Sequence, residues 1–117
     1  MRVAWVKYAR ASTAPPDAAT LTFVRVVWPV LVQPMEPAGL TADAIEHFLL
    51  SNPFTPSEPA LERVRRALTR WHEDKWHVVL DGMLSEGERV RVREGVNTVT
   101  RCLLALKTKY KSEGTGF

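Results

Sequence analysis

The chain has 117 residues, of which 45% are hydrophobic, and a net charge of +3 at pH 7. A chain of this size has enough apolar material for one core, so we expect a single domain over residues 1–117. No apolar run reaches the roughly 18 residues that a membrane-spanning helix needs, which argues against a membrane protein. The single cysteine, Cys102, excludes an internal disulfide, and the N-terminus lacks the architecture of a signal peptide. Both observations indicate an intracellular protein, in the cytoplasm or the nucleus.

Two segments near the N-terminus have the composition of β-strands. Residues 3–8 and 21–32 are rich in valine and aromatic residues, and the segment between them contains serine, threonine and two prolines. We therefore predict a two-stranded antiparallel ribbon, an N-terminal extension over residues 1–34. Because an isolated ribbon is marginal in water, it would pack on the helices or pair with a second copy of the chain in a homodimer.

A short helix is predicted after a turn that contains three prolines. Thr41 has the chemistry of an N-cap, and Asp43 suits the first turn. The helix should end at residues 51–53, where Ser-Asn-Pro disfavours helical backbone. Its apolar face is predicted from three residues: Ile45, Phe48 and Leu49.

The next predicted element is a basic amphipathic helix. Residues 55–58, Thr-Pro-Ser-Glu, form a capping box with Pro56 at the first helical position. Four apolar residues share one face: Leu61, Val64, Leu68 and Trp71. Three arginines fall within about 60° on the opposite face: Arg63, Arg66 and Arg70. This arginine stripe is either a solvated face or a binding surface, and the sequence leaves both open.

A long helix follows a loop that opens with residues 71–75, Trp-His-Glu-Asp-Lys. Its start is a second capping box at residues 85–88, Ser-Glu-Gly-Glu. Its apolar residues follow a heptad pattern: Val92, Val96, Val99, Leu103, Leu106 and Tyr110. Gly95 marks either a close contact or a weak point, and Gly114 offers a stop. We predict that the two helices form an antiparallel hairpin with facing apolar stripes.

The tetrad His72-Glu73-Asp74-Lys75 resembles the His-Pro-Asp motif of DnaJ-type co-chaperones, which lies between a basic helix and the next helix. Residues 28–30 (Trp-Pro-Val), the helix at 40–50 and the pattern over 90–106 are similar to a group of fungal J-like proteins. A similar Arg-Trp-His-Pro-Asp-Lys occurs in NF-kappa-B inhibitor-like proteins. The resemblance covers residues 21–107. It implies a mainly α fold, with a J-domain-like helical region over residues 38–113 beside the small β-ribbon.

The resemblance also implies a partner. In working J-domains the basic helix and the His-Pro-Asp loop contact a heat-shock chaperone ATPase and stimulate its hydrolysis. Carried over, the partner-binding residues are Arg63, Arg66, Arg70, His72, Glu73, Asp74 and Lys75. Glu73 replaces the proline that fixes the backbone dihedral, which implies that stimulation is lost or weak. Alternatively, His72 simply caps a helix end or bonds locally to Asp74.

No pattern in the sequence indicates catalysis, a cofactor or a metal. A glycine-rich phosphate loop and a nucleophile elbow are absent, and the histidines match no metal-ligand spacing. Cys102 lies beside the heptad residues, where an inert packed thiol is expected. Trp71 and Trp76 are expected to anchor the core and the loop rather than to stack on bases.

We therefore expect a protein that is not an enzyme, and three classes of function remain. The first is a protein-interaction or adaptor module, or a working DnaJ-type co-chaperone if stimulation survives. The second is a nucleic-acid-binding module using the arginine stripe, which ranks lower because the charge excess is small. The third is a structural subunit that pairs through the β-ribbon.

Overall fold

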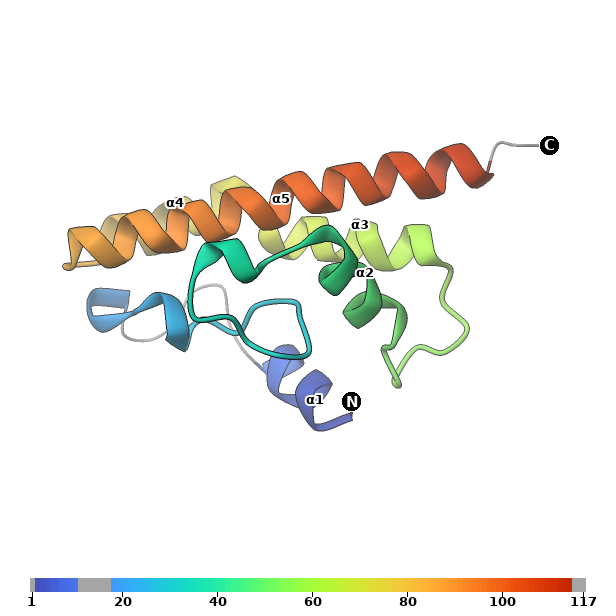
Figure 1. Cartoon of the computed structure of the whole chain (residues 1–117), viewed down its shortest axis with the longest axis horizontal. Coiled ribbons are helices and arrows are strands. Elements are labelled where there is room, and N and C mark those ends of the chain that lie inside the picture. The colour runs from blue at the N-terminus through green and yellow to red at the C-terminus, as the bar shows by residue number, and fades with distance from the viewer. Residues whose placement is uncertain (1, 11–17, 115–117) are drawn as a thin grey trace.

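The computed structural model of the protein describes residues 2–10 and 18–114. Within them the chain forms five α-helices: α1 Arg2–Arg10, α2 Ala42–Leu50, α3 Ala60–Trp71, α4 Glu73–Gly82 and α5 Glu86–Gly114. Three single-turn 3-10 helices lie between α1 and α2: Ala18–Thr20, Phe23–Arg25 and Pro37–Gly39. In Figure 1, α5 runs along one long side of the molecule. The predicted mainly helical fold is confirmed. In the part of the chain that is described, no helix is both long and apolar enough to cross a bilayer.

α5 is the element on which α2, α3 and α4 pack. The first half of its predicted capping box forms, because Ser85 Oγ accepts a hydrogen bond from the Glu88 backbone N–H at 3.3 Å. The Glu88 carboxylate instead accepts hydrogen bonds from the Phe23 N–H and from Arg91, both at 3.1 Å. Five of the six predicted heptad residues are buried: Val92, Val96, Val99, Leu103 and Leu106. The sixth, Tyr110, is partly buried and packs against the core. The seam that was read from the sequence is therefore the core-facing side of this helix.

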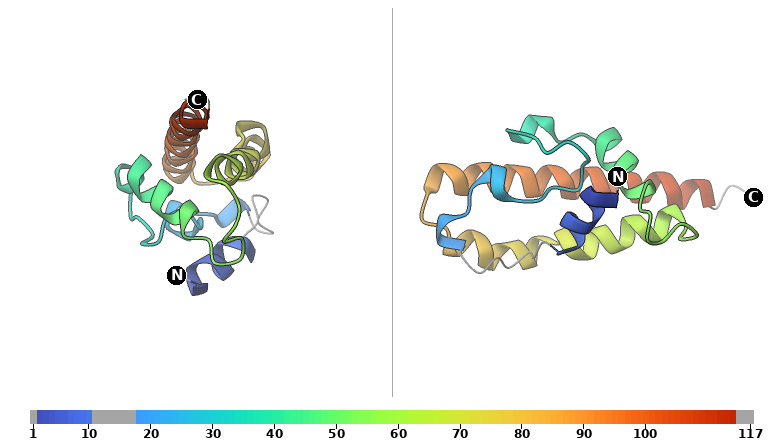
Figure 2. Two further views of the ribbon diagram at one scale, coloured as in Figure 1. Left: turned by 90° about the vertical axis from the view of Figure 1, so that its right-hand side faces the viewer. Right: turned by 90° about the horizontal axis from the view of Figure 1, so that it is seen from below.

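An arm of two helices, α3 followed by α4, packs antiparallel to α5 (Figure 2). Val64 and Trp71 of the predicted stripe are buried, and Leu68 packs at the edge of the core. The predicted hairpin is thus confirmed, but the predicted loop after Trp71 is largely a helix. Trp76 and Val79 form the buried inner face of α4, and Met83, the C-cap residue that follows the helix, is buried beside them.

α2 forms as predicted and contacts both α3 and α5. Thr41 Oγ1 accepts a hydrogen bond from the Ala44 N–H at 3.2 Å, and Ser51 is the C-cap. Glu46 anchors the helix to the end of α5, because its carboxylate accepts hydrogen bonds from Lys109 Nζ at 2.8 Å and from the Tyr110 hydroxyl. Both hydrogen bonds hold the pKa of Glu46 below its usual value, and the bond from Lys109 has the larger effect. The predicted apolar face is buried: Ile45, Phe48 and Leu49.

The predicted N-terminal β-ribbon is not seen: the described residues contain no strand. Residues 2–10 form α1, and residues 21–32 form a 3-10 turn followed by irregular backbone. Trp5 and Tyr8 lie three residues apart and pack together on Phe48 of α2, with Trp5 stacked on it at 4.4 Å between ring centroids. This long-range packing outweighs the strand preference of the valines. Residues 11–17 of the predicted connecting loop lie outside the described residues, and the predicted ribbon dimer has no described strand to pair.

α3 begins about one turn later than predicted. Residues 55–58 form a turn closed by the Glu58 N–H and the Thr55 carbonyl at 3.1 Å, and Ala60 is the first helical residue. Pro59 explains the delay, because it has no N–H to donate and its ring disfavours helical backbone at Glu58. The capping box predicted at Thr55 therefore does not form.

Gly95 is a point of close contact, which decides between the two alternatives that the sequence left open. A Cβ at residue 95 would lie 2.5 Å from Cη2 of Trp28 and 2.9 Å from Cε2 of Phe23. Trp28 is fully buried, and Gln33 fixes its backbone by accepting from the Trp28 N–H at 2.7 Å and donating to the Trp28 carbonyl at 2.9 Å. The indole ring therefore has no free space into which it could move.

Trp28 also begins a stack of three tryptophans. Its ring lies 5.2 Å from that of Trp71, and the ring of Trp71 lies 5.1 Å from that of Trp76, with interplanar angles of 16° and 9°. The stack joins the segment before α2 to the end of α3 and to α4. All three side chains are buried, as predicted for Trp71 and Trp76.

Gly95→Ala should lower the free energy of unfolding by about 1–3 kcal/mol, the usual range for overpacking a core. The control is Gly87→Ala in the same helix, where a Cβ meets nothing within 4 Å. That change should be neutral or should stabilise by up to about 1 kcal/mol, because alanine favours helix. Urea denaturation measures both. Equal effects of the two substitutions would contradict the close packing of Trp28 on Gly95.

Candidate partner-binding groove

The tetrad lies at a one-residue break between α3 and α4. His72 has φ −59° and ψ 136°, and it is both the C-cap of α3 and the N-cap of α4. Its Nδ1 accepts a hydrogen bond from the Asp74 N–H at 3.2 Å and lies 3.7 Å from Asp74 Oδ2. The predicted local bond between His72 and Asp74 is therefore confirmed, and both side chains are exposed.

Glu73 is the first residue of α4. The N–H at this position has no partner within a helix, and proline is favoured there. A proline at residue 73 is compatible with α4.

Arg63 does not belong to an exposed stripe, which corrects the prediction. Its side chain is buried, with 7% of the residue exposed. The guanidinium donates to the carbonyls of Glu58 at 2.9 Å and Leu49 at 3.0 Å, and also to that of Thr55. Since Leu49 lies in the last turn of α2, Arg63 satisfies a carbonyl that the helix itself leaves unpaired. Arg63 thus ties α2 and the following turn to α3.

Arg70 lies on α1 rather than in open solvent. Its guanidinium carbon is 3.9 Å from the centroid of the Tyr8 ring, and Nη2 donates to the Tyr8 carbonyl at 2.7 Å. The Tyr8 hydroxyl accepts a hydrogen bond from Trp71 Nε1 at 2.8 Å. Burial raises the pKa of Tyr8, and the charge of Arg70 and the bond from Trp71 offset this only in part. Tyr8 is therefore neutral, and α1 is bound to the end of α3.

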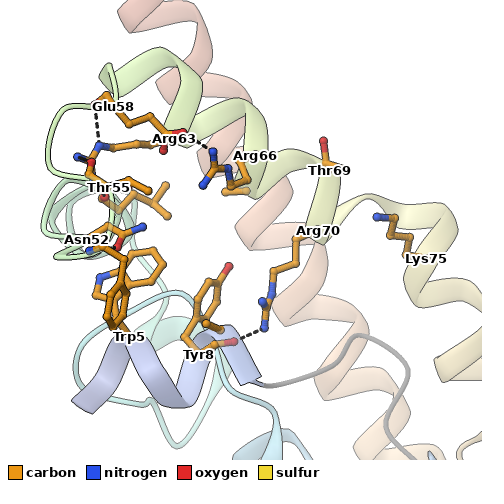
Figure 3. Close-up of a pocket in the computed structure, with 14 residues that line it drawn as sticks. Trp5, Tyr8, Asn52, Thr55, Glu58, Arg63, Arg66, Thr69, Arg70 and Lys75 are labelled. Atoms are coloured by element: carbon orange, nitrogen blue, oxygen red, sulfur yellow. Dashed lines mark hydrogen bonds and ion pairs between the residues drawn. The ribbon is translucent and has the colours of Figure 1, made fainter. Parts of the chain in front are cut away.

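A groove of about 680 Å³ opens between α1, the turn at residues 52–58 and α3 (Figure 3). Four of the predicted partner-binding residues line it: Arg63, Arg66, Arg70 and Lys75. Arg66 pairs with Glu58 and remains largely exposed, with 66% of its side chain accessible. His72 and Asp74 are not among the lining residues. The structure thus gathers the three predicted arginines and Lys75 around one groove and leaves His72 and Asp74 outside it.

Three aromatic residues of the groove were not predicted as site residues: Trp5, Tyr8 and Phe54. They come from α1 and from the turn after α2, far in sequence from the arginines. The spacing of Trp5 and Tyr8 was a helical signal, but it was outweighed by the valines around them. No local pattern links Phe54 to the other two.

The described residues hold no group of three or more His, Cys, Asp or Glu side chains that could bind a metal. Cys102 is half-buried beside the α5 seam, and burial raises the pKa of its thiol. A raised pKa makes a thiolate nucleophile less available at neutral pH. The sequence-based expectation of a packed thiol agrees with this placement.

The chain matches no protein-family model, no curated protein and no solved structure. A function for the groove is therefore inferred from its geometry and from the residues of the tetrad.

Arg63→Ala should destabilise the protein by about 1–3 kcal/mol, because the carbonyls that it satisfies would be left buried without a donor. Arg66→Ala is the matched control on the same helix. It removes an ion pair in which most of the Arg66 side chain is exposed, and it should cost less than about 1 kcal/mol. Thermal or urea denaturation distinguishes the two. If both changes were equally mild, Arg63 would not connect α2 to α3 as described.

Proposed function

We propose that the protein is a non-catalytic protein-interaction or adaptor module on a J-like scaffold, in which chaperone stimulation is lost or weak. One juxtaposition carries the proposal. Lys75 belongs to the tetrad, in which His72 and Asp74 are exposed, and it also lines the groove beside α3, so the two features adjoin each other. A partner that contacts the tetrad can reach the groove without crossing the core.

The surroundings of the tetrad support weak or lost stimulation. His72 and Asp74 are exposed and contact each other, so no packing against the core fixes their side chains. Each such side chain must be ordered when a partner docks, which lowers affinity. Glu73 also adds a negative charge where the J-domain motif has a neutral proline.

A nucleic-acid-binding function has less support. Arg63 is buried, Arg66 pairs with Glu58, and Arg70 packs on Tyr8. On α5, Arg89 donates to the Met83 carbonyl and Arg91 to the Met35 carbonyl. Most of these guanidinium groups are used within the fold. They do not form the continuous row of free cations with which a protein follows a phosphate backbone.

The first test is ATP turnover by a cytosolic heat-shock chaperone in the presence of the wild type, Glu73→Pro and Asp74→Asn. We expect little stimulation by the wild type, some gain in Glu73→Pro, and no change from wild type in Asp74→Asn. Glu73→Pro is expected to fold, since position 73 is the first of α4. Strong wild-type stimulation that Asp74→Asn abolishes would instead identify a working co-chaperone.

The second test separates protein from nucleic acid. Binding to RNA or duplex DNA should be weak and non-specific, in the region of 10⁻⁴–10⁻⁶ M at physiological salt. A pull-down from the native cell should retain a protein, and Arg66→Glu with Lys75→Glu should release it. Nanomolar RNA binding that Arg66→Glu abolishes would contradict the proposal.

A further inference from the structure

The groove offers two kinds of surface to a ligand. Its α3 and α4 wall carries positive charge from Arg66, Arg70 and Lys75, whereas its opposite wall is aromatic (Figure 3). Phe54 is half-exposed, and the guanidinium carbon of Arg2 lies 5.6 Å from the centroid of its ring. The volume of about 680 Å³ is within the range of ligand pockets and exceeds that of one side chain. Its chemistry suits a short segment that has carboxylates beside an apolar residue.

The groove already contains a carboxylate of the protein itself. Among the described residues that line it, Glu58 carries the negative charge, and it pairs with Arg66. Glu58 is mostly covered, with 14% of its side chain exposed, whereas most of Arg66 is accessible. A guanidinium has five N–H donors, so Arg66 can take a second carboxylate. The charge of Glu58 would weaken that second interaction.

Nucleic acid fits the same cavity poorly. Trp5 is stacked on Phe48, and the ring of Tyr8 is covered by Arg70, so neither offers a free face to a base. Arg66 and Lys75 are the exposed cations among the described lining residues. Two cations next to an aromatic wall match a carboxylate and an apolar side chain better than a row of phosphates.

We propose that the groove binds a short acidic segment of another protein. The carboxylates of the segment pair with Arg66 and Lys75, an aromatic or aliphatic side chain packs on the half-exposed ring of Phe54, and Glu58 competes with the incoming carboxylate. This assignment names the class of partner for the interaction module proposed above and rests on that function.

The experiment is fluorescence anisotropy with the full chain and a labelled peptide, acetyl-Asp-Asp-Phe-Leu-Asp-Asp-amide. Two analogues remove one property each: Asn-Asn-Phe-Leu-Asn-Asn removes the charge, and Asp-Asp-Ser-Ser-Asp-Asp removes the apolar side chains. We expect the parent peptide to bind at least about tenfold more tightly than either analogue, equivalent to about 1.4 kcal/mol. Its affinity should fall as salt increases, because Arg66 and Lys75 are exposed.

Variants of the protein locate the binding. Arg66→Gln and Lys75→Gln should each weaken the parent peptide severalfold, and Glu58→Gln should strengthen it. Arg65→Gln is the matched control: Arg65 is the neighbour of Arg66 in α3, pairs with Glu62 and does not line the groove. It changes the net charge equally and should leave the affinity unchanged. Far-ultraviolet circular dichroism checks that each variant is folded.

Any one of four results would overturn the inference. Equal losses of affinity in Arg65→Gln and Arg66→Gln would indicate non-specific attraction. If Glu58→Gln does not strengthen binding, Glu58 does not compete with the carboxylates of the peptide. Equal binding of the uncharged analogue would indicate a purely apolar partner. If no peptide binds while the pull-down still retains a protein through Arg66 and Lys75, the acidic segment is wrong and the interaction module stands. If the pull-down also fails, the proposed function is wrong as well.

Discussion

The break at His72 is the constraint on which the rest of the molecule depends, and tryptophan packing requires it. In an uninterrupted helix, residues five apart point about 140° away from each other. Trp71 and Trp76 are five apart, yet both are buried and their rings stack at 5.1 Å. The chain achieves this by leaving helical backbone at His72 for a single residue. The same break leaves the side chains of His72 and Asp74 exposed, while Trp28 packs on Trp71 and against Gly95.

Some cations of α3 and α4 bind backbone carbonyls and others stay exposed, and the difference depends on which elements pack beside them. Arg63 and Arg70 share a helix face with Arg66, but α2, the turn after it and α1 supply backbone carbonyls that bind the first two. These guanidinium groups stabilise the fold by satisfying backbone carbonyls that are buried or partly buried. Arg66 and Lys75 remain exposed beside a cavity with an aromatic wall. The proposed partner therefore depends on the two cations of the groove that stay exposed, Arg66 and Lys75.

Local signals in the sequence predicted some elements well and missed others for identifiable reasons. Thr41 and Ser85 accept the hydrogen bonds expected of N-caps, because capping depends on residues three apart. The capping box at residues 55–58 predicted a helix start that ignored Pro59. Because of Pro59, α3 begins about one turn later, at Ala60. α1 could not be predicted from its valines, since its helix depends on Phe48. The groove was half predicted: the arginines share a helix, but no spacing in the sequence brings residues 5, 54 and 70 together.

The most direct test of this account is a proton NOE experiment that measures contacts among the three tryptophan rings and Gly95. Folded protein should give NOEs between the Gly95 Hα protons and the Hη2 and Hζ2 protons of Trp28, because a Cβ at Gly95 would lie within 3 Å of both carbons. Ring protons of Trp71 and Trp76 should also give NOEs to each other, since their centroids are 5.1 Å apart. Absence of both sets in the folded protein would contradict the stack and the position of the tetrad that follows from it.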